Sequence, residues 1–208
     1  FIDMKTSLGK HLPIIFLSFL FFVFTASPLE AKVKIHSITS PGGDLELQVV
    51  TETNISFCLL YKDNLLVSSP ALSLRLKDGT VLGPNARLLK AKKTDSREII
   101  PSPLYRKSQI DDQYRQLDVK FRGGFGIRFR VYDQGAAYQF YTEQKDSLCI
   151  MEESAGFIFE KDYACYIPYS RGEDNPFQNS FENVYSVIPI SEFDREKLAF
   201  LPLMVCLD

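Results

Sequence analysis

The chain has 208 residues, is 45% hydrophobic, and carries 24 Lys and Arg against 26 Asp and Glu, a formal net charge of −2. This length supports one well-packed domain, or at most two. Because there is no basic excess and no Lys/Arg block, nothing in the sequence favours binding to nucleic acid or to an anionic membrane surface. The only histidines, His11 and His36, are too few and too badly placed for a histidine-based triad or zinc site.

The first 31 residues are typical of a secretory signal. Two lysines follow Met4, then an apolar core of about 13 residues (12–24), then a small-residue exit ending at Ala31. The apolar core is shorter than the roughly 20 residues of a membrane-spanning helix. We predict a signal-peptide helix cleaved after Ala26 or Ala31, with an uncleaved N-terminal anchor as the alternative. The three residues before Met4 are expected to lie upstream of the natural start.

Alternating runs and turn residues dominate the chain after the leader. Strands are predicted over 32–40 and 45–51, and a hairpin over 55–69. A second hairpin is predicted over 72–82, where Asp78-Gly79 gives the strongest short turn signal of the chain.

Residues 87–108 lose clean periodicity and contain two prolines, which predicts a strand followed by an extended loop. Two or three alternating strands follow over 113–121 and 126–143. The remaining predicted elements are a strand, turn and strand over 154–169, a long polar loop over 171–184, and closing strands over 186–193 and 198–207.

No segment outside the leader shows a sustained 3.6-residue repeat of helical length. Many strands at roughly 8–12-residue spacing favour a sandwich over a parallel α/β sheet. We therefore predict an all-β fold: one large antiparallel β-sandwich over residues 32–208, preceded by the signal-peptide helix over residues 1–31.

The four cysteines leave two interpretations open. Their number is even in a chain predicted to be exported, which permits disulfides. Each also lies in an apolar, strand-like run, where cysteine often serves as a small buried hydrophobe. The wide spacing, without a C-x-x-C pair, does not favour a metal cluster. These residues are Cys58, Cys149, Cys165 and Cys206.

Paired carboxylates do not make a glycosidase site in this sequence. Such an enzyme needs two carboxyl groups roughly 5–10 Å apart across one bond. Adjacent strand residues point to opposite faces, so the doublets are interpreted as solvated turn or edge charges. The doublets are Asp111-Asp112, Glu152-Glu153 and Glu173-Asp174. The chain has no Trp, and most of its Tyr and Phe fall at alternating strand positions that favour core packing.

Five stretches, taken together and in order, resemble the N-terminal domain of glycoside hydrolase family 97, exported bacterial α-glucosidases and α-galactosidases. They are SPGGDLELQV, LSLRLKDGTVLG, PLYRKSQIDDQYRQLDVKF, IRFRVYDQGAAYQF and YACYIPY with SFENVYSVIPISEF. The resemblance extends from about Ser40 to Asp208, and its most specific stretch is FRVYDQGAAYQF, residues 129–140. Within that stretch, Arg130 and Asp133 are expected to fix a strand and turn rather than to contact substrate.

The resemblance implies that this β-sandwich is of the super-sandwich type and precedes a catalytic (β/α)8 barrel and a small C-terminal β-domain. It also implies a calcium ion in the active site, to which the sandwich contributes one glutamate from a loop. Glu182 falls where that ligand is expected. Asn179, Asn183 and Tyr185 are expected to support the loop or to contact sugar. A single carboxylate should bind calcium poorly by itself, because calcium takes about six to eight oxygen ligands.

The expected partners are therefore the barrel in the same polypeptide and an α-linked oligosaccharide, without nucleic acid and without membrane attachment after signal cleavage. A barrel needs roughly 250 further residues, so no catalytic residue is assigned and this chain alone is not expected to hydrolyse glycosides. It is expected to be periplasmic or associated with the outer membrane of a bacterium. The alternative is a free-standing glycan-binding or assembly module that uses Phe177 and Phe181.

Overall fold

The computed structural model describes residues 34–104, 106–172, 175–178 and 180–207. The predicted leader, residues 1–31, lies outside these residues. No helix in the described part is long and apolar enough to span a bilayer.

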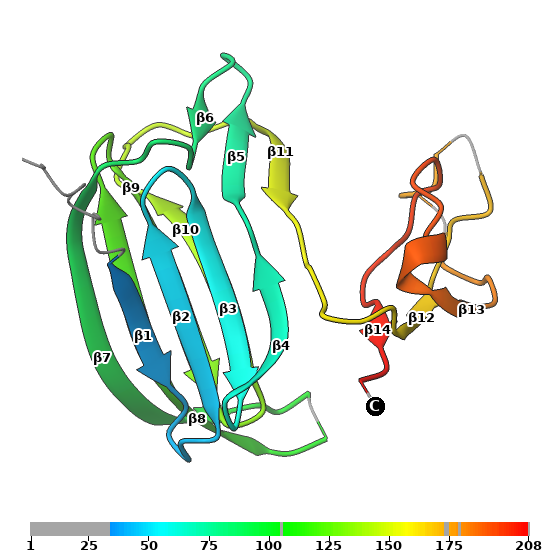
Figure 1. Cartoon of the computed structure of the whole chain (residues 1–208), viewed down its shortest axis with the longest axis horizontal. Coiled ribbons are helices and arrows are strands. Elements are labelled where there is room, and N and C mark those ends of the chain that lie inside the picture. The colour runs from blue at the N-terminus through cyan, green and yellow to red at the C-terminus, as the bar shows by residue number, and fades with distance from the viewer. Residues whose placement is uncertain (1–33, 105, 173–174, 179, 208) are drawn as a thin grey trace, which may run out of the picture. The chain divides into compact units, whose positions relative to one another are not determined.

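Two four-stranded antiparallel sheets form the body of the sandwich (Figure 1). The first has the order β1-β2-β3-β4, with strands Ile35–Thr39, Leu45–Thr51, Ile55–Tyr61 and Asn64–Ser69. The second has the order β10-β9-β8-β7, with β7 Leu88–Pro101, β8 Gln109–Phe121, β9 Phe125–Tyr132 and β10 Gly135–Thr142. Each strand pairs with the next along the chain, so short turns can connect the neighbours.

The core of the sandwich follows from strict alternation along its strands. In β2 every second side chain from Leu45 to Val49 is buried, and the same holds in β9 from Ile127 to Val131. Because alternate side chains point to one face of a sheet, these two sets meet between the sheets. Phe129 at the centre is 1% exposed and lies edge-on to Phe57, with ring centroids 6.4 Å apart.

A three-stranded sheet adjoins the sandwich, in the order β11-β5-β6. Its strands are Leu72–Leu76 (β5), Val81–Leu82 (β6) and Ile150–Ala155 (β11). The predicted Asp78-Gly79 turn connects β5 to β6: the Thr80 amide donates to Asp78 Oδ1 at 2.9 Å, and Gly79 adopts φ +87°. A positive φ is what glycine permits without strain. Leu72 joins the sandwich core.

A small sheet with its own hydrophobic cluster occupies the C-terminal part. Its order is β13-β12-β14, with strands Ala164–Ile167 (β12), Ser186–Pro189 (β13) and Met204–Val205 (β14). A 3-10 turn, Ile190–Glu192, follows β13. The buried members of the small hydrophobic cluster are Cys165, Ile167 and Tyr169, and this cluster is separate from the sandwich core.

The all-β antiparallel sandwich predicted from the sequence is confirmed, with differences in strand length. β7 continues to Pro101 where a loop was expected, because its whole length pairs with β8 and proline is tolerated at the last position of an edge strand. The predicted closing strand over 198–207 is reduced to Met204–Val205. The region 154–169 contributes the end of β11, β12 and two isolated bridges, Ser68 to Ile158 and Tyr169 to Ala199, instead of two full strands.

The four cysteines are free thiols in the structure, in different environments. Cys165 is buried in the small cluster, and this burial raises the pKa of its thiol. Cys58 and Cys206 are half-buried, and Cys149 is exposed. The interpretation as small buried hydrophobes therefore fits Cys165 well and does not fit Cys149.

Candidate functional site

The predicted polar loop, residues 171–184, lies between β12 and β13, and backbone-directed hydrogen bonds hold its described part. The side-chain Nδ2 of Asn183 donates to the Tyr169 carbonyl oxygen at 3.0 Å, and the side-chain Oδ1 of Asn183 accepts a hydrogen bond from the backbone amide of Val184 at 2.9 Å. Arg171 Nη2 donates to the Glu182 carbonyl oxygen. Asn183 thus uses both ends of its side-chain amide to position the loop, while its expected contact with sugar stays a prediction.

Glu182 is exposed, and its carboxylate has no hydrogen bond or ion pair with any described residue. The nearby Arg171 guanidinium binds the backbone carbonyl of Glu182 instead of forming an ion pair with the side chain. A cavity of only about 10 Å³ lies between this loop and Phe200. That volume holds about one water molecule, so this cavity between the described residues is too small for a sugar.

Aromatic residues of the loop pack on one another. Phe181 lies edge-on to Tyr185 at 5.6 Å and to Phe200 at 5.8 Å, and Phe177 lies edge-on to Phe200 at 6.1 Å. Phe177 nevertheless remains 77% exposed. Tyr185, predicted to contact sugar, is 41% exposed with one side of its ring covered by Phe181.

The described residues fit a calcium site only as contributors to it. Calcium takes about six to eight oxygen ligands, and the described residues of the loop offer one carboxylate, that of Glu182. No group of three or more His, Cys, Asp or Glu within the described residues could hold a metal ion. Asn179, also predicted to act at the site, lies outside the described residues, as do Glu173 and Asp174.

The carboxylate doublets are separated as the strand geometry predicts. Glu152 accepts two hydrogen bonds from Arg75, whereas Glu153 accepts the Tyr138 hydroxyl at 2.6 Å. Asp111 accepts hydrogen bonds from Arg97 Nε and Nη2 at 3.1 and 2.8 Å. These hydrogen bonds hold the pKa of the Asp111 carboxyl below its ordinary value. Neither described doublet therefore forms a catalytic pair.

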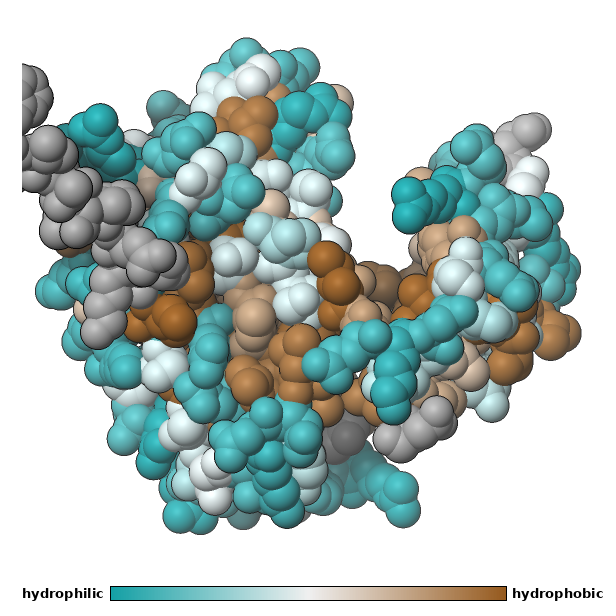
Figure 2. Space-filling view, in the orientation of Figure 1, coloured by the Kyte–Doolittle hydropathy of each residue, from teal (hydrophilic) through white to brown (hydrophobic). Residues whose placement is uncertain are grey.

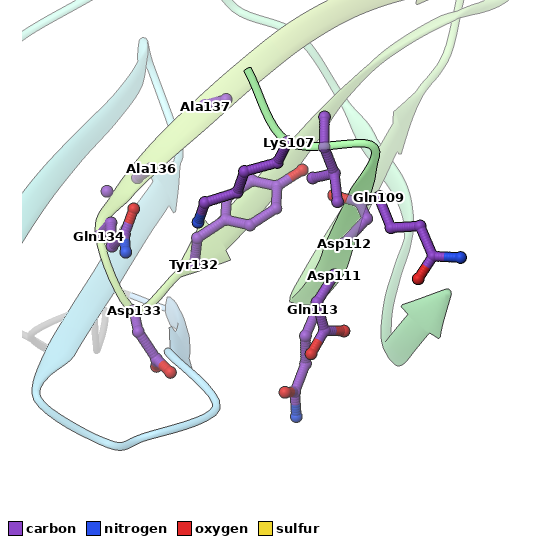
Figure 3. Close-up of a pocket in the computed structure, with 12 residues that line it drawn as sticks. Lys107, Gln109, Asp111, Asp112, Gln113, Tyr132, Asp133, Gln134, Ala136 and Ala137 are labelled. Carbon is purple, nitrogen blue, oxygen red and sulfur yellow. The ribbon is translucent and has the colours of Figure 1, made fainter. Parts of the chain in front are cut away.

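A polar cleft that the sequence did not reveal lies at one end of the second sheet. Pairing between β8 and β9 ends at Arg115 and Val131, and β9 then turns back through Tyr132 and Gly135 into β10. β8 continues beyond that point, paired only with β7. The split leaves a cleft of about 800 Å³, which we name the end cleft. Its polar and aromatic lining is Lys107, Gln109, Asp111, Asp112, Gln113, Tyr132, Asp133 and Gln134 (Figure 3).

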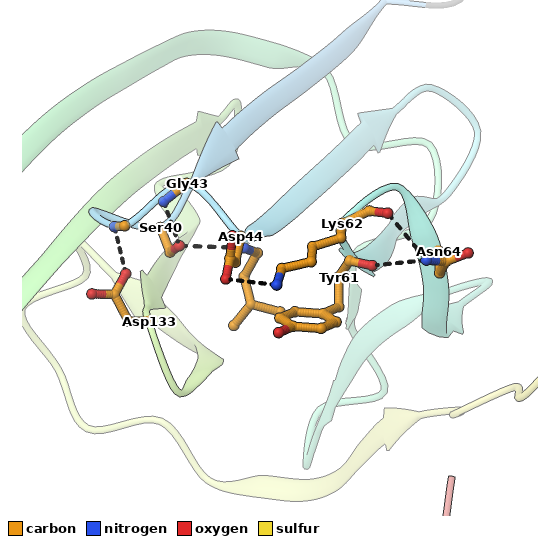
Figure 4. A network of polar contacts seen from close by, with 9 residues as sticks. Ser40, Gly43, Asp44, Tyr61, Lys62, Asn64 and Asp133 are labelled. Carbon is orange, nitrogen blue, oxygen red and sulfur yellow. Dashed lines mark hydrogen bonds and ion pairs between the residues drawn. The ribbon is translucent and has the colours of Figure 1, made fainter. Parts of the chain in front are cut away.

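The β9–β10 side of the end cleft is tied to the first sheet. The Gly42 amide in the β1–β2 turn donates to Asp133 Oδ1 at 2.6 Å. Figure 4 shows that this turn also contacts the β3–β4 turn, through the Asp44–Lys62 ion pair at 3.5 Å. Asp133 therefore fixes a turn, as the sequence predicts. A Cβ on Gly42 would lie 2.9 Å from the Asp133 oxygen, so the close approach depends on glycine.

The aromatic wall of the end cleft rests on a stack that crosses β8 and β9. The Arg130 guanidinium lies 4.1 Å from the centroid of the Tyr114 ring, and Arg130 Nε donates to Gln116 at 3.0 Å. Tyr114 in turn packs against Tyr132, with ring centroids 5.4 Å apart. Arg130 thus holds a strand, as predicted, and fixes the position of the Tyr132 ring.

Comparison with known proteins gives a consistent match. Residues 38–208 match the family model described as Glycosyl-hydrolase 97 N-terminal. A retaining alpha-galactosidase of Bacteroides thetaiotaomicron is 31% identical over 177 residues, which are 83% of this chain and 27% of that protein.

Two solved structures share the fold. One is a glycoside hydrolase family 97 enzyme in complex with acarbose, from Pseudoalteromonas sp. strain K8, with TM-score 0.61, 18% identity, and coverage of 74% of this chain and 24% of that chain. The other is a beta-arabinopyranosidase, with TM-score 0.62, 21% identity, and coverage of 73% and 26%. The chain thus spans about a quarter of the length of these relatives.

Proposed function

We propose, from the premise that this chain belongs to the glycosyl hydrolase 97 N-terminal family, that it is the sandwich domain of a longer, exported α-glycosidase. In this role it braces a catalytic (β/α)8 barrel and contributes Glu182 as a calcium ligand to the active site. The observation that carries the proposal is the family match over residues 38–208. The match at 31% identity to an alpha-galactosidase supports an α-galactoside as substrate, with other α-linked oligosaccharides as the broader class.

The bracing role is supported by an apolar row on the small sheet. Tyr166 of β12 pairs with Val187 of β13 and Met204 of β14, so the three side chains share one face. They are 36%, 56% and 53% exposed, respectively. Figure 2 shows hydrophobic residues at the surface of this C-terminal region. A cross-strand apolar row at the surface is typical of a contact with another domain, and the barrel is the partner that we assign to it.

The calcium role is supported by the local geometry of Glu182. Its backbone is fixed by Arg171 and by the hydrogen bonds of Asn183, while its carboxylate is exposed and without a partner among the described residues. A positioned, unpaired carboxylate can serve as one oxygen ligand of a calcium ion whose other ligands come from elsewhere. Calcium, when bound, would supply Lewis-acid polarisation and positive charge at the active site.

Two measurements test the proposal. Sequencing the gene past the Asp208 codon should extend the reading frame by a barrel-sized segment of roughly 250 residues. In the full protein, Glu182→Gln should raise the calcium concentration needed for half-maximal hydrolysis of a nitrophenyl α-galactoside by about tenfold or more, because it removes one charged ligand.

The matched control is Glu192→Gln, an exposed glutamate in the 3-10 turn of the same region, which should leave the calcium dependence unchanged. Equal calcium dependence in the wild type and the Glu182→Gln protein would remove the ligand role. A frame that stops without a barrel would contradict the proposal as a whole for this product.

A further inference from the structure

We propose that the end cleft binds a neutral oligosaccharide, at a site separate from the Glu182 loop and independent of any barrel. The cleft volume of about 800 Å³ lies within the roughly 300–1,000 Å³ of sites that bind small organic ligands. The inference goes beyond the proposed function, because it gives the sandwich a binding surface of its own.

The chemistry of the end cleft selects the ligand class. Lys107 is the one cation among the described residues that line the cleft. The described lining of the end cleft therefore lacks the basic cluster that recognises phosphate or sulfate. The carboxylates that line it form no metal-binding group within the described residues. Its aliphatic lining side chains are Ile110, Ala136 and Ala137, which form a small apolar surface for a hydrophobic ligand. Amides and carboxylates around an aromatic ring suit sugar hydroxyls and the C–H face of a sugar ring.

Several side chains in the end cleft remain available to a ligand. Gln109, Gln113 and Gln134, together with the Asp112 carboxylate, have no hydrogen-bond partner within the part of the chain that the structure describes. Glutamine offers both a donor and an acceptor, as a sugar hydroxyl does. Figure 3 shows Lys107 and Tyr132 between Gln134 on one side and Gln109 and Asp112 on the other.

The backbone adds further polar groups to the cleft. Residues 109–114 of β8 pair with β7 on one side and with no described strand on the other. An unpaired strand edge presents amide and carbonyl groups that a ligand can bind. Because β8 pairs with β7 along its whole length, this unpaired edge of β8 is held in place at the base of the end cleft.

The walls of the cleft are fixed before any ligand arrives. Asp111 is held by two hydrogen bonds from Arg97, Asp133 accepts the Gly42 amide, and Tyr132 rests on Tyr114. Side chains locked by such contacts lose little conformational entropy on binding, which favours affinity for a weakly binding sugar. The end cleft therefore combines a preformed aromatic wall with unoccupied polar groups.

The test is a titration of the purified chain with maltotetraose and with stachyose, followed by calorimetry and by backbone amide chemical shifts. Saturable binding with a dissociation constant of about 1 mM or tighter is expected for at least one probe. The largest shifts should fall on residues 109–113 and 132–137. Gln134→Ala and Asp112→Asn should each weaken binding by about threefold to tenfold, because the first removes a polar side chain and the second replaces a carboxylate acceptor by an NH2 donor.

Two controls identify the surface. Gln139→Ala changes the same residue type on the exposed part of β10, outside the cleft, and should leave binding unchanged. Phe181→Ala alters the Glu182 loop and should also leave it unchanged. Binding lost in Phe181→Ala but kept in the cleft variants would overturn the proposal, as would the absence of binding to both probes. Self-association of the chain through residues 109–114, seen by light scattering, would instead assign the open β8 edge to strand pairing.

Because calcium and the barrel are absent from this titration, its result does not depend on the role of Glu182. The end cleft can fail to bind sugar while the calcium proposal stands, and the reverse also holds.

Discussion

The sandwich and the small C-terminal sheet differ in the length of their strands and in how many residues they bury. Strands β8 and β9 are 13 and 8 residues long, and the core between the two large sheets includes Leu117, Val119 and Ile127, each 0% exposed. In the small sheet β12 has four residues and β14 has two, and the buried members are Cys165, Ile167 and Tyr169.

This difference shows which part of the molecule is self-sufficient. A strand that is buried on one face needs a second layer of comparable length to cover it. The sandwich supplies both layers from its own residues, whereas the small sheet keeps the row Tyr166, Val187 and Met204 at its surface. We therefore expect the sandwich to provide most of the stability of the chain, and the small sheet to depend on a further surface for its full stability.

The largest effect is expected from Phe129→Ala at the centre of the sandwich. Phe129 is 1% exposed and contacts Phe57 and Tyr138, so the truncation leaves a cavity worth about 3–5 kcal/mol in the free energy of unfolding. Denaturant unfolding followed by circular dichroism measures the loss. Phe177→Ala, at a side chain that is 77% exposed, is the matched control and should change stability by less than about 0.5 kcal/mol.

Ile167→Ala should sharpen the comparison by affecting one region only. Ile167 is 0% exposed at the centre of the small cluster, and its truncation costs about 2–5 kcal/mol locally. Hydrogen exchange should show faster exchange in β12 and β13 with unchanged protection in β8 and β9, because the two clusters are separate. Ile150→Ala, at a 54% exposed position, is the control. Equal loss of protection in both regions would mean that they unfold as one unit.

The smallest effect is expected at His36 on the inner face of β1. His36 is 8% exposed, its Nε2 has no hydrogen-bond partner in the described structure, and burial, with Lys34 and Lys93 nearby, lowers its pKa below 6.5. The stability linked to a depressed pKa is complete above pH 6.5 and is lost as the pH falls toward the folded-state value.

His36→Leu should remove this slope and raise the free energy of unfolding by about 1 kcal/mol, because a buried unsatisfied nitrogen is replaced by an apolar group. Urea midpoints of both proteins at about pH 5 and about pH 8 measure the change. Parallel pH profiles for the two proteins would contradict the assignment of the slope to His36.

The clearest strands of the sandwich, such as β2 and β9, could be predicted because they repeat one short-range rule, the alternation of buried and less buried side chains. The alternation in 45–51 and 126–132 and the turn at Asp78-Gly79 are local signals that the structure confirms. The length of β7 could not be predicted, since residues 97–101 are held by pairing with β8 and not by their own pattern. The closing region 198–207 was predicted as one strand because apolar residues dominate it, although only Met204 and Val205 pair.

The two sites differ in what the sequence can reveal. Glu182 could be proposed because a family resemblance points to that position, and the structure adds how Arg171 and Asn183 fix the loop. The end cleft depends on where the pairing of β8 and β9 stops, which is a register property without a local sequence signal. Asp112 within β8 and Gln134 in the β9–β10 turn carry no distinguishing sequence signal, and the split between β8 and β9 brings them to one cleft.

Strand β7 has a consequence for solubility. It is the longest described strand, with 14 residues, and forms an outer edge of its sheet. The backbone groups on its side away from β8 have no described strand partner and could template the growth of a cross-β aggregate. Charged side chains interrupt this edge at Lys90, Lys92, Lys93, Asp95, Arg97 and Glu98. A strand of another molecule that paired with this edge would have to lie beside these charged side chains. Pro101 at the end of β7 cannot donate a backbone hydrogen bond to such a strand. The charged side chains and Pro101 therefore disfavour amyloid-like assembly through this edge while the chain is folding.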